Sequence, residues 1–151
     1  MESSINELIS ERSFTRKSVA PDGNCFFNAL VLSLGRQGRK TSMTALRAIA
    51  SLALIEKKDD FLPFFDAEGD EGLAEEEYLK GARAVRRSKC WDHQMVDLVV
   101  GLMPELLQIN LTIFYAGEDG EIIEYETQVE GANVSLVLLR INDNHFDVLL
   151  K

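Results

Sequence analysis

Two side chains near opposite ends of the chain, Cys25 and His145, could together support nucleophilic chemistry. The turn-forming triplet Asp22-Gly23-Asn24 precedes Cys25 and an apolar run follows it, which predicts that the cysteine lies in the first turn of a helix. There the helix dipole favours the thiolate, the nucleophilic form of cysteine. The tight turn can also present unpaired backbone N–H groups to an oxyanion. Taken alone, a cysteine at a helix start is more often a small buried hydrophobe.

The tripeptide His145-Phe146-Asp147 supplies a candidate base and the acid that would orient it. Residues two apart on a strand point to the same face, so Asp147 can accept a hydrogen bond from the His145 ring and fix its tautomer. Phe146 then points into the core. The only other histidine, His93, follows Asp92 at a predicted helix start and has no such partner, so we do not favour it as the base.

The elements that must position these residues follow from periodicity and from turn signals. Helices are predicted over Asn24–Leu34, Met43–Lys57, Glu75–Val85 and Asp92–Gln108. The apolar face of the second comprises Leu46, Ile49, Ala50, Ala53 and Leu54, and Pro104 should kink or end the last. Strands are predicted over Leu111–Tyr115, Glu121–Val129, Val134–Ile141 and Phe146–Leu150. Helices first and an antiparallel meander last predict an α+β domain.

Composition and charge exclude several classes of protein. With 151 residues we expect one domain, residues 1–13 forming a flexible or helical extension. A net charge of −9 argues against a nucleic-acid partner. No apolar run suits a membrane span and the start is unlike a signal peptide, so we expect a cytosolic protein. Two cysteines without zinc-ligand spacing predict neither a disulfide framework nor a metal, and Cys90 should be a structural thiol.

The two segments resemble the signature boxes of the ovarian-tumour (OTU) cysteine proteases, which are deubiquitinases. The nucleophile box reads Asp22-Gly23-Asn24-Cys25-Phe26-Phe27, and the C-terminal box reads His145-Phe146-Asp147. Between them, Phe61-Leu62-Pro63-Phe64, Glu77-Tyr78-Leu79 and Cys90-Trp91-Asp92 fall in the family's order, so the similarity spans about Ser13 to Lys151. One departure is Asp92, where family members often have glycine after the tryptophan, which puts the shape of that loop in doubt.

The resemblance implies a papain-like OTU fold, with helices around a small, mainly antiparallel sheet. It also implies that Cys25 attacks the carbonyl of ubiquitin's C-terminal glycine in an isopeptide bond. His145 would be the base and Asp147 its orienting acid. Asp22 would order the loop Asp22, Gly23, Asn24 and Cys25, whose backbone shapes the oxyanion hole, and Gly23 would admit the substrate backbone.

Substrate contacts are expected at Asn144, Trp91, Glu75 and Glu76, although Trp91 also suits the core. The acidic run from Asp66 to Glu77 is either a solvated loop leading into a helix or an arm that meets a basic surface of the modifier. We expect a monomer that needs no cofactor and acts on ubiquitin, polyubiquitin or a ubiquitin-like modifier. By analogy, a compact OTU domain would suit a bacterial effector or viral protein in a host cytosol.

Two other functions stay open on the sequence. One is a catalytically silent OTU-like module that binds ubiquitin, which the presence of Cys25, His145 and Asp147 disfavours. The other is a scaffold protein in which the cysteine box is purely structural.

Overall fold

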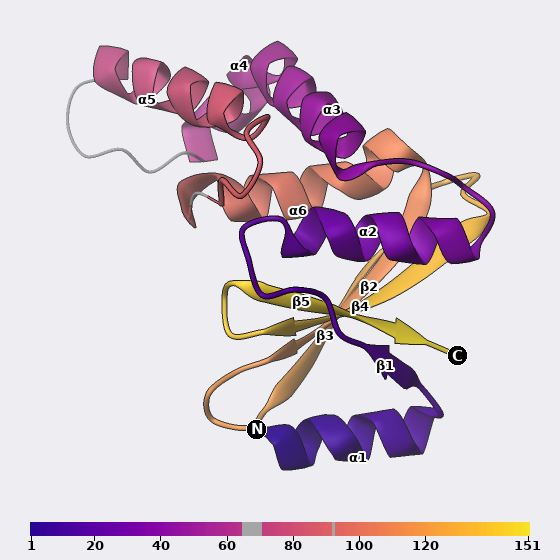
Figure 1. The fold of residues 1–151 in the computed structure, drawn as a ribbon. Coiled ribbons are helices and arrows are strands. Elements are labelled where there is room, and N and C mark those ends of the chain that lie inside the picture. The colour runs from indigo at the N-terminus through magenta and orange to yellow at the C-terminus, as the bar shows by residue number, and fades with distance from the viewer. Residues whose placement is uncertain (65–70, 92) are drawn as a thin grey trace.

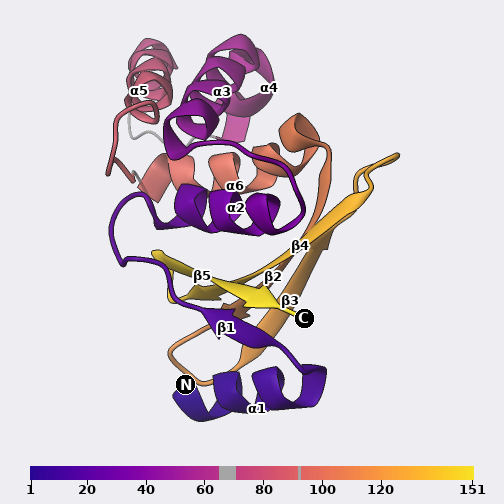
Figure 2. The ribbon, with the colours of Figure 1, turned by 45° about the vertical axis from the view of Figure 1, so that its right-hand side comes forward.

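The computed structural model describes residues 1–64, 71–91 and 93–151, and its core is one mixed sheet with helices on both faces (Figure 1). The helices are α1 (Glu2–Arg12), α2 (Cys25–Arg36), α3 (Met43–Glu56), α4 (Lys58–Phe61), the 3-10 turn η1 (Leu62–Phe64), α5 (Glu71–Ala84) and α6 (His93–Leu107). The strands are β1 (Thr15–Lys17), β2 (Ile109–Ala116), β3 (Ile122–Thr127), β4 (Val134–Ile141) and β5 (His145–Leu150). Helix α1 covers one face, and the other helices lie on the opposite side (Figures 1 and 2).

The sheet order β1-β5-β4-β2-β3 corrects the predicted meander. Strands β2 and β3 form a hairpin, but β4 returns to the other edge of β2 and runs parallel to it, while β5 pairs antiparallel with β4 and with β1. Burial explains the order. Strand β3 is exposed along most of its length and suits an edge, whereas β4 buries Leu136, Leu138 and Leu139 and belongs in the middle.

Each face of the sheet has its own hydrophobic cluster. The larger lies under α2, α3 and α6 and includes Cys25 and Phe146. The smaller lies under α1 and includes Ile5, Phe14 and Leu149. Phe146 is therefore in the core, as predicted, and the strand alternation leaves His145 and Asp147 on the face that α1 covers.

The predicted helices are present with shifted ends. Helix α3 begins after Ser42, whose hydroxyl accepts a hydrogen bond from the Ala45 amide at 3.1 Å. The predicted apolar face of α3 is wrong at one position, because Ile49 is exposed and Arg47 is buried instead. Helix α6 continues through Pro104 to Leu107.

The acidic run from Asp66 to Glu77 is helical from Glu71 onward, because α5 starts four residues before the predicted position. Residues 65–70 of that run lie outside the described residues. In the described ranges, no helix has both the length and the apolar character needed to cross a membrane.

Candidate active site

Cys25 is the first residue of α2, one position after the predicted helix start, and its side chain is 1% exposed. Its Sγ donates a hydrogen bond to the backbone carbonyl of Asn144 at 3.3 Å. Asn144 immediately precedes His145, so the fold brings together two segments that are about 120 residues apart in the sequence. The cysteine and histidine boxes therefore meet at one point.

The surroundings of Cys25 favour its neutral thiol over the thiolate. Burial raises its pKa above the ordinary value of 9.0, and the nearby Asp22 carboxylate raises it further. Backbone hydrogen bonds from Phe146 and Phe26 offset only part of this. Backbone amides at the helix start therefore favour the thiolate, in the predicted direction, but burial outweighs them and the net shift of the pKa is upward.

The loop before Cys25 is ordered by Asp22. Its carboxylate accepts the Asn24 amide at 2.9 Å, and its carbonyl accepts the Cys25 amide at 3.1 Å. The Gly23 amide makes no hydrogen bond within the described part of the chain. A side chain at Gly23 would place its Cβ only 1.9 Å from the Lys89 carbonyl oxygen, so the close approach of the Lys89 backbone requires glycine at this position.

A buried arginine that the sequence did not single out fixes this loop from behind. Arg47, on α3, is 1% exposed, and burial lowers its pKa. It donates to the Asn24 side-chain oxygen at 2.8 and 3.2 Å and to the Gly23 carbonyl at 2.6 Å. It also donates to the carbonyls of Val85 and Cys90 at 2.7 and 3.0 Å. Arg47 therefore ties the cysteine loop to the segment after α5.

Asn24 completes this network, and its side chain makes no capping hydrogen bond to the helix that it precedes. Its Oδ1 also accepts the Lys89 amide at 2.6 Å, and its Nδ2 donates to the Ser88 hydroxyl at 3.1 Å. The side chain is 6% exposed, so these bonds satisfy a polar group that burial would otherwise penalise.

His145 and Asp147 form the predicted pair at the start of β5. His145 Nε2 lies 2.8 Å from Asp147 Oδ1. Because a carboxylate only accepts hydrogen bonds, Nε2 carries a proton in this pair. Nδ1 is buried and has no partner among the described residues. The hydrogen bond of the Cys25 thiol goes to the neighbouring Asn144 carbonyl rather than to this nitrogen.

A cavity of about 350 Å³ lies at the meeting point of the two boxes. It is lined by Pro21 and by five of the predicted site residues, Asp22, Gly23, Trp91, Asn144 and His145. Trp91 has a second role in the core, where its ring packs edge-on against Phe27 and Phe146. Its indole Nε1 is buried without a partner among the described residues.

Two of the predicted substrate contacts lie elsewhere. Glu75 and Glu76 are on α5, which packs against α3, and neither lines this cavity. Glu75 forms an ion pair with Lys58 at 2.5 Å. The side chain of the alternative base, His93, and the whole of Asp92 lie outside the described residues.

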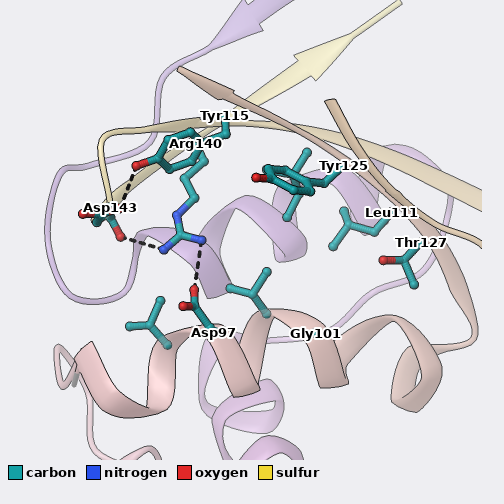
Figure 3. A pocket seen from close by; sticks show the side chains of 11 residues that line it. Asp97, Gly101, Leu111, Tyr115, Tyr125, Thr127, Arg140 and Asp143 are labelled. Carbon is teal, nitrogen blue, oxygen red and sulfur yellow. Dashed lines mark hydrogen bonds and ion pairs between the residues drawn. The ribbon is translucent and has the colours of Figure 1, made fainter. Parts of the chain in front are cut away.

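A larger cavity of about 630 Å³ lies beside the first, between α6 and the strands β2, β3 and β4 (Figure 3). Arg140 spans it, with Nη1 3.3 Å from Asp97 Oδ1 and Nη2 donating to the Asp143 carbonyl at 3.0 Å. The Tyr115 hydroxyl donates to Asp143 Oδ1 at 2.7 Å, and this bond raises the pKa of Tyr115. Asp143 belongs to the loop that carries Asn144 and His145, so the two cavities share one loop.

The described residues contain no cluster of three or more His, Cys, Asp or Glu side chains that could hold a metal ion.

Comparisons with known proteins identify the family of the chain. The family model described as OTU-like cysteine protease matches residues 20–139, which include Cys25. The match covers most of the chain, so the chain belongs to the OTU-like cysteine protease family. His145 and Asp147 lie beyond the matched residues. A comparison with curated protein sequences finds no match.

Solved structures of OTU domains share the fold. The OTUD1 OTU domain has a TM-score of 0.71 at 19% identity, over 99% of this chain and 93% of that one. An OTU deubiquitinase from Wolbachia pipientis wMel has a TM-score of 0.64 at 16% identity, over 91% and 88%. The Hazara virus OTU bound to ubiquitin has a TM-score of 0.54 at 19% identity, over 90% and 80%. The predicted α+β OTU fold is therefore confirmed.

Proposed function

We propose that this protein is a thiol-dependent deubiquitinase that hydrolyses the isopeptide bond after the C-terminal glycine of ubiquitin or of a ubiquitin-like modifier. The observation that carries the proposal is the hydrogen bond from Cys25 Sγ to the carbonyl of Asn144, the residue before His145. The His145 ring is held through Nε2 by Asp147, and its Nδ1 has no partner among the described residues. Membership of the family and the ubiquitin complex of the Hazara virus OTU support the choice of substrate.

The reaction we propose begins when Cys25 Sγ leaves the Asn144 carbonyl and gives its proton to His145 Nδ1. Sulfur then attacks the glycine carbonyl carbon, and the carbonyl electrons move to oxygen. Collapse of this intermediate breaks the C–N bond, and the lysine amine leaves with the proton from Nδ1. Water, deprotonated by the same nitrogen, hydrolyses the thioester and restores the thiol.

The oxyanion would be stabilised by amides of the loop Asp22, Gly23, Asn24 and Cys25. Of these, the Asn24 and Cys25 amides already donate to Asp22, whereas the Gly23 amide has no partner in the described chain. We therefore assign the first oxyanion contact to Gly23. The Cys25 amide can contribute only if the oxyanion displaces the Asp22 carbonyl.

We place the modifier's C-terminal segment along residues 142–145, because this loop lines both cavities. Contacts from Glu75 and Glu76 stay a prediction for a substrate large enough to reach α5. Exchanging both for glutamine should raise KM at low salt, where charge attraction is least screened. An unchanged KM at low salt would exclude them.

The test of the function is cleavage of ubiquitin dimers, followed by gel electrophoresis, with Cys25→Ala as the inactive control. Release of monoubiquitin by the parent protein alone would support the proposal.

The burial of the Cys25 thiol, which raises its pKa, gives one reason to consider the alternative, an OTU-like module that only binds ubiquitin. Tight binding of ubiquitin without any cleavage would favour that alternative.

A further inference from the structure

Both carboxylate oxygens of Asp147 have partners within the site. Its Oδ1 accepts from His145 Nε2 at 2.8 Å and from the Val19 amide at 2.9 Å. Its Oδ2 accepts a hydrogen bond from Arg16 Nε at 3.0 Å and forms an ion pair with Arg16 Nη2 at 2.9 Å. A carboxylate offers about four acceptor sites. The two oxygens therefore have different partners: Oδ1 contacts His145, and Oδ2 contacts Arg16.

Arg16 reaches this position because of the register of the sheet. It lies on β1 opposite Leu149 of β5, which shares a face with Asp147 two residues earlier. Its side chain is about one-quarter exposed, whereas that of Asp147 is 1% exposed. The remaining guanidinium nitrogen of Arg16, Nη1, lies 3.3 Å from Glu2 Oε2 at the start of α1. The guanidinium thus joins the N-terminal segment to the acid of the site.

We infer that Arg16 is a positioning residue for the proposed reaction: by holding Asp147 Oδ2, it keeps Oδ1 aimed at His145 Nε2 and so leaves Nδ1 free for the thiol. Without Arg16, Oδ2 would be a buried carboxylate oxygen with no partner, a state that costs substantial free energy. The carboxylate could then rotate or take up a proton. Either change would release the histidine ring from the tautomer that the chemistry needs.

The Arg12–Glu124 ion pair offers a matched control. Arg12 lies on the same N-terminal segment and contacts Glu124 at 3.3 Å, with both side chains 40% or more exposed. It touches neither His145 nor Asp147 among the described contacts. Exchange of Arg12 for glutamine removes an arginine ion pair from the same region, so it controls for the loss of charge.

The experiment compares Arg16→Gln, Arg16→Lys and Arg12→Gln with the parent protein. The first readout needs no substrate: ¹⁵N NMR of the His145 ring reports which nitrogen carries the proton, and a His93→Gln background leaves a single histidine to observe. The second is kcat and KM on a ubiquitin substrate. Thermal unfolding checks that each variant folds.

We expect the Nε2–H tautomer of His145 to dominate in the parent protein and in Arg12→Gln, and to give way to a mixture in Arg16→Gln. There kcat should fall at least about tenfold at nearly constant KM, because the effect resembles loss of a residue that orients a catalytic group. Arg16→Lys keeps the charge but not the guanidinium geometry, so its kcat and its tautomer ratio should lie between those of the parent protein and those of Arg16→Gln.

The inference fails if Arg16→Gln keeps the parent tautomer, whether or not its melting temperature drops, because Arg16 would then be purely structural. If Arg16→Gln does not fold, Arg16→Lys decides: parent values of both kcat and tautomer would overturn the inference, and a mixed tautomer would support it. The kinetic part rests on the proposed function, whereas the NMR part does not. A parent protein without ubiquitin turnover that still shows the tautomer change would refute the substrate and retain the role of Arg16.

Discussion

The two halves of the candidate site are held in different ways. The cysteine half is fixed mainly through backbone: Arg47, a buried residue of α3, donates to the carbonyls of Gly23, Val85 and Cys90. The histidine half is fixed through side chains, because Arg16 binds Asp147 and Asp147 in turn binds the ring of His145. A break in the first half therefore disturbs the fold itself, whereas a break in the second disturbs mainly the orientation of one ring.

The largest effect should come from removing the reacting groups. Cys25→Ala removes the nucleophile and His145→Ala removes the base, so each should lower kcat by at least about 10⁴-fold. Asp147→Ala should lower kcat less, by roughly 10²- to 10⁴-fold, because the orientation of His145 is only partly lost. Initial rates of ubiquitin cleavage measure all three. An active His145→Ala together with an inactive His93→Ala would contradict the assignment.

The next effect separates the two halves by stability. Arg47→Met leaves buried carbonyls and the Asn24 oxygen without donors, so it should lower the free energy of unfolding by about 3–5 kcal/mol. Urea denaturation measures this change. Arg16→Lys should cost much less, because its site lies near the edge of the sheet. Equal losses for the two variants would remove the distinction between the halves.

The smallest effect concerns the protonation of Cys25. The Asp22 carboxylate opposes the thiolate and so contributes to the raised pKa of Cys25, although burial is the larger cause. Asp22→Asn keeps an oxygen for the Asn24 amide but removes the charge. The pH profile for alkylation of Cys25 by iodoacetamide should therefore move to lower pH. A profile that stays in place or moves to higher pH would contradict a contribution of the Asp22 charge to the raised pKa of Cys25.

The sequence predicted the parts of the site that have a local signature. The turn before Cys25 and the His-x-Asp alternation are local patterns, and both correspond to what the structure contains. The strands β2 to β5 were also predicted, because β-branched residues and glycine turns mark them. Their parallel β2–β4 pairing was missed, since pairing depends on which strand must be buried rather than on sequence order.

The supporting arginines were harder to find. Arg47 lies among apolar residues in a helix, and the spacing from Arg47 to Ala50, Ser51 and Leu54 does mark one buried face. The predicted buried face of this helix included Ile49 instead and left out Arg47. Arg16 lies in a three-residue strand, which is too short to show any periodicity, so only the register with β5 reveals its partner.

The most direct test of the central claim is to treat the protein with ubiquitin that carries a thiol-reactive group at its C-terminus, followed by intact mass measurement and peptide mapping. We expect a single adduct on Cys25, which is lost in Cys25→Ala and much slower in His145→Ala. No adduct with ubiquitin, despite labelling of Cys25 by a small alkylator, would contradict ubiquitin as the modifier. An adduct on Cys90 instead would contradict the active site.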